Sequence, residues 1–289
     1  VSGMTAAIYA LRSDKSVLIL EKESIGGAIA SSPKIENYPG YQKISGAELA
    51  DNLYEQVISL GGVIELEEVT EIKVGNEKEV ITTDNIYTCK AIIIATGSKY
   101  RLLGLPNETD LIGNGVHFCV SCDGAFYKDK IVGVIGGGNT AITNALTLSE
   151  ICKKVYIIQN LSDLTGEKLL KEKLKEKKNV EIYYESTVKE LKKDDELKGI
   201  TIDYKGKNKD IKLDGIFVSI GQVPETNFIK NIINLNEYNY VLSDSECKTN
   251  IKGVFVSGDV RDKKVRQLTT ATNDGTISAI EAVNYIDSL

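Results

Sequence analysis

The sequence predicts a parallel α/β protein with two nucleotide-fold units. Segments with the patterns of strands and helices alternate along the chain, as they do in proteins built from parallel sheets and crossover helices. In residues 132–141 a strand runs into a glycine-rich turn of the G-x-G-x-x-A type, the fingerprint of a dinucleotide site. An earlier unit opens with an apolar helix at Gly3 and a buried strand that ends at Glu21. A chain of 289 residues has room for two domains with full cores.

The first unit carries only part of the dinucleotide fingerprint. Glu21 follows Gly3 by 18 residues, which is the interval of the ribose-binding acid if Gly3 is the third glycine of the motif. The first strand and the first two glycines would then precede Val1, so we expect the native chain to be longer. The predicted elements here are a helix over residues 1–11 and a strand over residues 17–21.

The remaining segments continue the alternation, and the last of them are expected to return to the first unit. The sequence predicts an antiparallel β excursion over residues 69–88, a buried strand over 91–97, a strand from Ile131 into the glycine turn, a helix from Thr140, a strand over 154–158, a solvated helix over 167–178, a polar β stretch over 180–213, strands over 215–221 and 253–259, and a helix over about 267–289.

Composition and charge exclude several classes of function. The net charge is −6 and the Lys and Arg residues are scattered among Asp and Glu, which argues against a nucleic-acid partner. No apolar run approaches the roughly 20 residues that span a bilayer, and no secretory leader is recognisable. Five cysteines at scattered spacing do not form an extracellular disulfide framework. These features predict a soluble cytoplasmic protein without a membrane or nucleic-acid partner.

The most informative motif is a pair of cysteines, Cys119 and Cys122, with Asp123 directly behind them. Cysteines at this spacing can close a small reducible ring, and thiol–disulfide exchange needs a local acid and base. The alternative is half of a zinc site, which needs four ligands. The other candidate ligands are one histidine and three isolated cysteines: His117, Cys89, Cys152 and Cys247. We therefore favour redox chemistry and expect no metal.

Several motifs in this order resemble the low-molecular-weight thioredoxin reductases, and the likeness spans essentially the whole chain. The motifs are the cysteine pair with Asp123, Gly124 and Phe126-Tyr127, the segment Glu36-Asn37-Tyr38-Pro39-Gly40, the turn Ala95-Thr96-Gly97, and Gly258-Asp259-Val260 followed by Arg266-Gln267.

The resemblance implies an α/β fold of two Rossmann-like three-layer nucleotide-binding domains. An FAD domain of residues 1–110 and 225–289 would be split around an inserted NAD(P)-type domain of residues 111–224, which carries the cysteines. Hinges near residues 110–115 and 222–226 would let the cysteines meet first the flavin and then a bulky protein. The resemblance also implies a homodimer.

The resemblance further implies an electron path and a set of site residues. Electrons would pass from a nicotinamide to FAD, to the Cys119–Cys122 disulfide, and then to thioredoxin or a similar protein. Cys122 would face the flavin, Cys119 would attack thioredoxin, and Asp123 would be the acid and base. The implied FAD contacts are Gly3, Glu21, Lys22, Gly26, Gly27, Asn37, Ala95, Thr96, Gly97, Gly258, Asp259, Arg266 and Gln267, and the implied nicotinamide contacts are Gly136, Gly138, Asn139, Thr140 and Ala141.

The electron donor is where the sequence departs from the family. In the family, the strand that corresponds to residues 154–158 is usually followed by a His-Arg-Arg cluster and a further Arg, which pair with the 2′-phosphate of NADPH. Residues 159–165 contain no cation, and Gln159 stands where an acid would bind the ribose of NADH. Three interpretations stay open: NADH bound through Gln159 or Asn160, NADPH bound weakly with cations from elsewhere, or reduced ferredoxin feeding the flavin directly. NADPH preference is the interpretation most weakened.

Other functions and other residues also carry expectations. Two alternative functions stay open. The protein could be a reductase of another dithiol protein, or it could be a flavin-bound redox sensor without catalysis. Ala28 replaces the Gln that the family usually has near the flavin. We expect His117 to be an ordinary packed or surface histidine, although a protonated ring there would favour the Cys119 thiolate. The three isolated cysteines are expected to be inert buried thiols.

Overall fold

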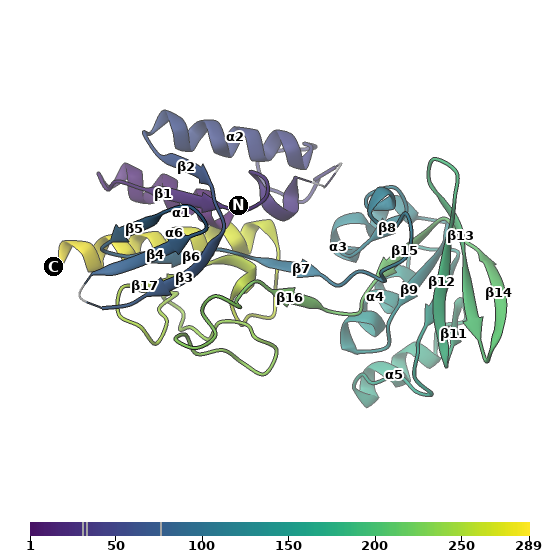
Figure 1. Ribbon diagram of the computed structural model, residues 1–289. Helices are drawn as coiled ribbons and strands as arrows, with labels where there is room; N and C mark the ends of the chain where they lie inside the picture. The colour runs from purple at the N-terminus through teal and green to yellow at the C-terminus, as the bar shows by residue number, and fades with distance from the viewer. Residues whose placement is uncertain (31, 33, 76) are drawn as a thin grey trace. The chain divides into compact units, whose positions relative to one another are not determined.

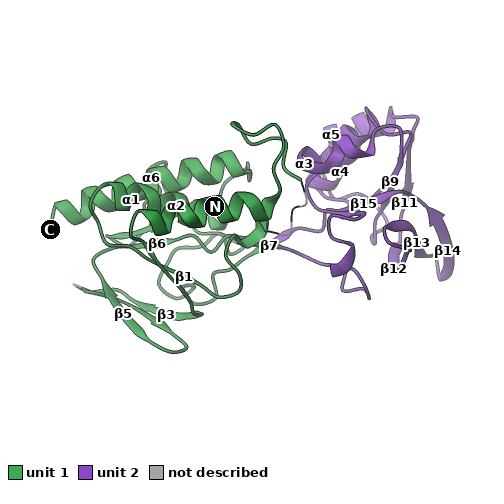
Figure 2. Cartoon of the chain, turned by 90° about the horizontal axis from the view of Figure 1, so that it is seen from above, with its two compact units in different colours: residues 1–99, 223–289 green, residues 100–222 purple. Residues whose placement is uncertain are grey.

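A computed structural model describes residues 1–30, 32, 34–75 and 77–289. It divides the chain into two compact units (Figure 2): unit 1 comprises residues 1–99 and 223–289, and unit 2 comprises residues 100–222. The chain crosses between the units in β7 (Ser98–Tyr100) and β16 (Gln222–Pro224), which pair as a two-stranded sheet. The sequence placed these crossings at residues 110–111 and 224–225. In the described part of the chain, no helix is long and apolar enough to cross a membrane.

The described part of unit 1 combines short parallel strand pairs with α-helices (Figure 1). β1 (Leu18–Glu21) pairs in parallel with β2 (Val63–Leu66), and β6 (Ile92–Ile94) pairs in parallel with β17 (Val254–Val256). The second pairing confirms that the end of the chain returns to the first unit. The helices are α1 (Ser2–Arg12), α2 (Gly46–Ser59) and α6 (Leu268–Asp287), with single 3₁₀ turns η1 (Gly27–Ile29) and η4 (Gly258–Val260).

Helices α1 and α6 pack against each other at a glycine. A Cβ on Gly275 would lie 2.5 Å from the backbone oxygen of Ser2, so the two helices can approach this closely only without a side chain there. Small residues of both helices are buried, including Ala6 and Ala7 of α1 and Ala279 of α6. The first turn of α1 is therefore held firmly against the C-terminal helix.

The antiparallel β excursion of unit 1 matches the prediction for residues 69–88. Its strands are β3 (Val69–Lys73), β4 (Lys78–Thr82) and β5 (Ile86–Cys89), paired in that order. Ile72 on β3 is buried with Ile94 of β6 and Val254 of β17 in one apolar cluster. The excursion therefore covers one face of the parallel strands.

Unit 2 is centred on a five-stranded parallel sheet in the order β11-β10-β9-β15-β8. The strands are β8 (Val116–His117), β9 (Ile131–Ile135), β10 (Lys154–Ile158), β11 (Val180–Tyr183) and β15 (Gly215–Val218). Helices α3 (Val120–Asp123), α4 (Asn139–Ser149) and α5 (Lys168–Lys175), and 3₁₀ turns η2 (Thr109–Leu111) and η3 (Gly124–Tyr127), complete the nucleotide-fold part.

Alternate residues of the unit 2 sheet face two different cores. Val134 of β9 packs into a cluster with α4 and α5, whereas its neighbour Ile135 packs into a cluster with the antiparallel strands. Those strands are β12 (Ser186–Lys193), β13 (Leu197–Tyr204) and β14 (Lys207–Lys212). Unit 2 thus has three layers, helices on one face of a parallel sheet and an antiparallel sheet on the other (Figure 1). The predicted parallel α/β class is confirmed.

Candidate functional site

Cys119 and Cys122 form a disulfide bond, with Cα atoms 5.3 Å apart. β8 ends two residues before Cys119, which is the N-cap of the short helix α3. The backbone N–H groups of Cys122 and Asp123 both donate to the Cys119 carbonyl oxygen, at 3.2 and 3.0 Å. The turn therefore holds the two sulfur atoms within bonding reach, and a bonded pair does not supply thiolates to zinc.

Asp123 faces a buried histidine that the sequence interpretation treated as ordinary. Asp123 Oδ2 lies 3.2 Å from His117 Nδ1, and the side chains are 17% and 6% exposed. His117 Nε2 is in turn 2.7 Å from the Tyr127 hydroxyl. The sequence offered one signal for this contact, since His117 is the only histidine and stands close to the cysteine pair.

The predicted flavin contacts all lie in unit 1, and the predicted nicotinamide contacts lie in unit 2 with the cysteine pair. In unit 1, three glycine-bearing segments converge. A Cβ on Gly3 would lie 3.3 Å from Ala95 Cβ, and one on Gly258 would lie 2.4 Å from Ser2 Oγ. The start of α1, the end of β6 and the η4 turn therefore meet at one place, at the carboxyl end of β6.

Two polar atoms at this place are buried without a hydrogen-bond partner among the described residues, Ser257 Oγ and Asp259 Oδ1. Lys263 Nζ lies 3.5 Å from Asp259 Oδ1 as an ion pair. Burial raises the pKa of the Asp259 carboxyl, which the charges of Lys263 and Arg266 only partly offset. Buried polar oxygens that lack a well-formed hydrogen bond are uncommon and suit a hydroxyl-rich ligand such as the ribityl chain of FAD, so the residues present fit this cofactor.

Other predicted flavin contacts are joined by hydrogen bonds within unit 1. The Asn37 amide donates to the Gln267 side-chain oxygen at 3.4 Å, and Gln267 is the N-cap of α6. The Arg266 guanidinium stacks on the Tyr240 ring at 4.0 Å and donates to the Asp259 carbonyl oxygen at 3.2 Å. The structure therefore brings the distant motifs at residues 37 and 266–267 together.

The acid and lysine at the end of β1 already have protein partners. Glu21 Oε1 accepts a hydrogen bond from the Glu23 backbone N–H at 2.9 Å, and Lys22 Nζ lies 2.9 Å from the Glu225 carboxylate. Thr96 Oγ1 donates to the Glu225 carbonyl oxygen at 2.8 Å. Lys22 and Thr96 are thus connected through one residue.

The remaining predicted glycines of unit 1 form turns that a side chain would disturb. Gly26 and Gly27 open the η1 turn with φ values of 107° and 57°, and Gly97 has a φ of 71°. A Cβ on Gly26 would lie 2.6 Å from Ala50 Cβ on α2. The positive φ favours glycine at all three positions, and at Gly26 the missing side chain also lets the backbone pass close to α2.

In unit 2 the glycine turn leads from β9 into α4, as the fingerprint predicts. Gly136 has a φ of 128°, and a Cβ there would lie 2.5 Å from the Ser219 backbone oxygen. Gly138 is the N-cap of α4, which continues through Asn139 and Thr140 to the fully buried Ala141. The turn therefore keeps the geometry of a phosphate-binding helix N-terminus.

The segment after β10 covers this turn with neutral and acidic groups. A Cβ on Gly137 would lie 2.4 Å from Gln159 Cδ, and the Thr165 N–H donates to the Gly137 carbonyl oxygen at 2.8 Å. Asn139 Oδ1 accepts from the Glu167 N–H at 2.7 Å, and its amide donates to the Glu167 carboxylate at 3.1 Å.

The lysine that follows this segment is engaged elsewhere. Lys171 Nζ donates to Asp163 Oδ2 at 2.8 Å and to the Leu164 carbonyl oxygen at 3.1 Å. Residues 159–165 contain no Lys, Arg or His of their own. A 2′-phosphate at this strand end would therefore meet no cation of that segment.

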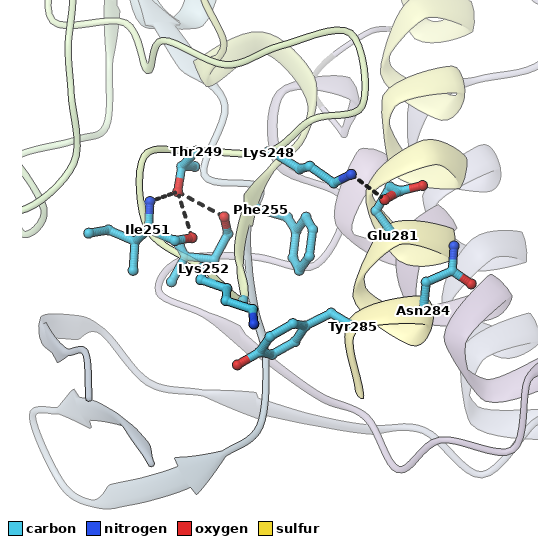
Figure 3. Close-up of a pocket in the computed structure, with 10 residues that line it drawn as sticks. Lys248, Thr249, Ile251, Lys252, Phe255, Glu281, Asn284 and Tyr285 are labelled. Atoms are coloured by element: carbon cyan, nitrogen blue, oxygen red, sulfur yellow. Dashed lines mark hydrogen bonds and ion pairs between the residues drawn. The ribbon is translucent and has the colours of Figure 1, made fainter. Parts of the chain in front are cut away.

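A separate cavity of about 320 Å³ lies in unit 1 between the segment from Lys248 to Phe255 and helix α6 (Figure 3). The Lys248 ammonium pairs with the Glu281 carboxylate at 2.8 Å, and Thr249 Oγ1 donates to the Val254 carbonyl oxygen at 2.8 Å. None of the predicted site residues lines this cavity. It is therefore distinct from the cluster around Asp259.

Comparison with known proteins agrees with this geometry. The model of the family described as "Pyridine nucleotide-disulphide oxidoreductase" matches residues 1–275. A curated "34.2 kDa protein in rubredoxin operon" of Clostridium pasteurianum is 41% identical over 99% of this chain and 94% of its own length. A thioredoxin reductase of Bacillus subtilis is 34% identical over 100% of this chain and 92% of its own length.

Solved structures show the same fold. The thioredoxin reductase of Streptococcus pyogenes is 37% identical, with a TM-score of 0.96 over 100% of this chain and 95% of that one. A ferredoxin-flavin thioredoxin reductase of Clostridium acetobutylicum is 26% identical, with a TM-score of 0.53 over 100% of this chain and 95% of that one. The prediction of two Rossmann-like domains is confirmed. The chain belongs to the pyridine nucleotide-disulphide oxidoreductases, within the low-molecular-weight thioredoxin reductase family.

Proposed function

We propose that the protein is an FAD-dependent disulfide reductase that passes two electrons through the Cys119–Cys122 disulfide to thioredoxin or a similar dithiol protein. The observation that carries this proposal is the disulfide itself, closed at the N-terminus of α3 with Asp123 directly behind it. The relatives named as thioredoxin reductases cover the whole chain, which supports the same activity here.

The FAD that family membership implies would be held in unit 1. Gly3, Ala95 and Gly258 supply closely approaching backbone, and Asp259 supplies a buried acceptor for a flavin hydroxyl. Bound FAD supplies a two-electron carrier that can reduce a disulfide. The Oδ1 atom of Asp259 is itself buried, so water would compete little for a hydrogen bond at that atom.

The chemistry of the cysteine pair follows from thiol–disulfide exchange. Reduction breaks the Cys119–Cys122 bond with two electrons and two protons and leaves two thiols. The Cys119 thiolate then attacks one sulfur of the partner disulfide to form a mixed disulfide, and the Cys122 thiolate attacks Cys119 to release the reduced partner. Asp123 takes the proton of the attacking thiol and returns it to the leaving thiolate.

The donor proposal rests on the glycine turn of unit 2 and on the segment that covers it. The turn at Gly136 and Gly138 supports a nicotinamide dinucleotide, because its backbone conformation suits a pyrophosphate. Residues 159–165 favour NADH over NADPH, because they bring no cation to a 2′-phosphate. Gln159 is buried against Gly137, so Asn160 is the better candidate for the ribose.

A second candidate donor is a reduced ferredoxin that feeds the flavin directly. The observation that favours it is the covering of the glycine turn by Gln159, Thr165 and Glu167. A carboxylate next to the first residue of α4 opposes a phosphate at the same place. A solved structure with this fold is named as a ferredoxin-flavin thioredoxin reductase, which supports ferredoxin as a candidate donor.

The proposal also covers the acceptor protein, the oligomeric state and the cellular compartment. Thioredoxin is the favoured acceptor because the relatives are named for it. Cys89, Cys152 and Cys247 are free thiols, which suits a reducing compartment such as the cytoplasm. A homodimer, and a swivel of the units about the crossings at residues 99–100 and 222–223, remain part of the proposal.

One anaerobic experiment tests this function. The FAD-loaded protein is mixed with NADH, NADPH or a reduced ferredoxin, and the flavin absorbance is followed before a bacterial thioredoxin and a dithiol-sensitive dye are added. We expect one donor to bleach the flavin and thioredoxin reduction to follow. If no donor bleaches the flavin, the enzyme assignment is wrong and the sensor alternative is favoured.

A further inference from the structure

The histidine next to the cysteine pair is held on both ring nitrogens inside unit 2. His117 Nδ1 faces Asp123 Oδ2 at 3.2 Å, and Nε2 faces the Tyr127 hydroxyl at 2.7 Å. The His117 ring also stacks on Phe217 of β15, with centroids 5.4 Å apart and 29° between the planes. His117 is paired in register with Phe217 across the parallel strands. The ring therefore has little freedom to turn away from either polar partner.

These contacts define the directions of the two hydrogen bonds. An ionised Asp123 can only accept, so the His117 Nδ1–H donates to it. In the neutral ring Nε2 is then an acceptor, and the Tyr127 O–H donates to it. A continuous chain of hydrogen bonds thus runs from the carboxylate behind the disulfide to the Tyr127 hydroxyl.

The Tyr127 end of this series of hydrogen bonds opens into a cavity of about 180 Å³. His117, Tyr127, Lys130, Glu196 and Asp214 line it together with neighbouring loop residues. Space of this size with polar walls holds several waters. The Lys130 ammonium lies 5.2 Å from the centre of the Tyr127 ring. Burial, and then the charges of Asp123, Glu196 and Asp214, raise the pKa of Tyr127, so its hydroxyl keeps its proton at neutral pH.

We propose that His117 and Tyr127 are positioning residues that connect Asp123 to this cavity and carry its proton to and from water. The inference rests on the proposed acid and base role of Asp123. The Asp123 carboxylate takes the Nδ1 proton of His117 and passes it to a thiolate of the reduced pair. His117 Nε2 then takes the Tyr127 proton, and a cavity water restores the hydroxyl. One proton moves from water to sulfur, and oxidation of the dithiol returns it along the same path.

This path gives the half-buried cysteine pair a source of protons while a protein partner covers the sulfurs. Cys119 and Cys122 lie at the start of α3, where the bulky acceptor has to dock, so water has little access to Asp123 from that side during exchange. The cavity is lined by residues of other loops, including residues 113–115. Proton transfer between Tyr127 and water in this cavity can therefore continue during thiol–disulfide exchange with the partner protein.

The chain offers a direct readout because His117 is its only histidine. Histidine labelled with ¹⁵N in the ring gives a spectrum of this residue alone, in the FAD-loaded protein as the disulfide and after anaerobic reduction to the dithiol. We expect the Nδ1–H tautomer in the disulfide form and a change in the two ring ¹⁵N chemical shifts on reduction. Asp123→Asn should remove that change. Identical ring ¹⁵N spectra in the two redox forms would overturn the proposal.

A second measurement follows the reduced cysteine pair itself. The FAD-loaded dithiol protein reacts with a small aromatic disulfide, and the thiol-release rate is recorded against pH in H₂O and D₂O. His117→Gln keeps hydrogen-bonding groups beside both partners but cannot relay a proton, so the rate should fall about tenfold or more and its isotope effect should shrink. Tyr127→Phe should slow the reaction in the same sense. The matched control Tyr156→Phe, on β10, should react as the parent does.

The outcomes separate this inference from the proposed function. If Asp123→Asn is slow while His117→Gln and Tyr127→Phe react at the parent rate, Asp123 keeps its role and the relay is wrong. If Asp123→Asn itself reacts at the parent rate, the acid and base role fails and the relay fails with it. Retention of the closed disulfide and of the melting temperature in His117→Gln shows that a slow rate is not caused by unfolding.

Discussion

The side-chain amide of Gln159 lies against Gly137, the middle glycine of the turn between β9 and α4, so closely that a Cβ on the glycine would lie 2.4 Å from Gln159 Cδ. Gln159 is 3% exposed, and its amide donates to the Asp163 carbonyl oxygen at 3.0 Å. The strand end that usually selects the nucleotide is therefore occupied by a neutral, satisfied side chain. This contact makes the donor the most testable part of the function.

Adding cations beside Gln159 should create NADPH preference. The double variant Asn160→Arg/Thr165→Arg places guanidinium groups where a 2′-phosphate would lie, and charge-assisted hydrogen bonds contribute about 1.5–3 kcal/mol each. We expect NADPH to bleach the flavin at concentrations at least about tenfold lower than in the parent, with little change for NADH. Asn208→Arg on the exposed strand β14 is the matched control for charge. Equal gains for NADH and NADPH would contradict a 2′-phosphate effect.

Replacing Asp259, whose Oδ1 atom is buried, should stabilise the protein without FAD and weaken its binding of FAD. Burial raises the pKa of Asp259, so the folded state binds this proton more tightly than the unfolded chain does. The contribution to stability is present in full below the unfolded pKa and is lost as the pH rises through the folded pKa. Ionising this carboxyl therefore costs the folded apoprotein more than it costs the unfolded chain, and Asp259→Asn removes that cost.

Thermal unfolding of the apoprotein and the FAD-loaded protein measures both effects. We expect Asp259→Asn to raise the melting temperature of the apoprotein at pH 7 and to reduce the further rise that FAD gives. Asp262→Asn, an exposed neighbour, should change neither value. An unchanged FAD-induced rise in Asp259→Asn would remove Asp259 from the flavin contacts.

The ion pairs of Asp274 should be the most costly to break in unit 1. Asp274 is 6% exposed and lies 2.7 Å from Arg261 and 2.9 Å from Lys263. Asp274→Asn leaves two cations near one another without their carboxylate, and breaking a buried pair costs about 3–5 kcal/mol. Unfolding in urea should show this loss, whereas Asp287→Asn, in an exposed pair with Lys15, should cost at most about 1 kcal/mol. Equal effects of the two substitutions would contradict the account of unit 1.

The buried free thiols should resist alkylation and should limit stability at high pH. Burial raises the pKa of both Cys152 and Cys247 to about 11. Both therefore stay protonated in the folded state near pH 9, where unfolded thiols already ionise. Their contribution to stability is full below pH 9 and is lost as the pH rises toward 11. Mass spectrometry after iodoacetamide at pH 8 should find them unmodified when folded and modified in urea.

The local patterns of the sequence predicted most of the fold. The strand at residues 154–158 is present with these bounds, and the β excursion over residues 69–88 was found as β3, β4 and β5. The cysteine pair was predicted from spacing and resemblance, and it is closed in the structure. These features depend on residues close in sequence or on motifs, which a single chain can reveal.

The contacts that the sequence did not reveal depend on pairing between distant segments. The place of His117 follows from the pairing of β8 with β15, which buries its ring on Phe217. The partner of Lys22 is Glu225, 203 residues further along the chain. Neither partner carries a local signal, because an acid or an aromatic residue is common at any position.

The most direct test of the central claim is single-turnover electron transfer in Cys122→Ser and Cys119→Ser beside the parent protein. Each FAD-loaded protein is reduced anaerobically by its active donor and then mixed with oxidised thioredoxin, and reduced thioredoxin is quantified. The account predicts that the flavin bleaches in all three proteins and that thioredoxin reduction falls at least about a thousandfold in both variants. Thioredoxin reduction at the parent rate in either variant would contradict electron transfer through the Cys119–Cys122 disulfide.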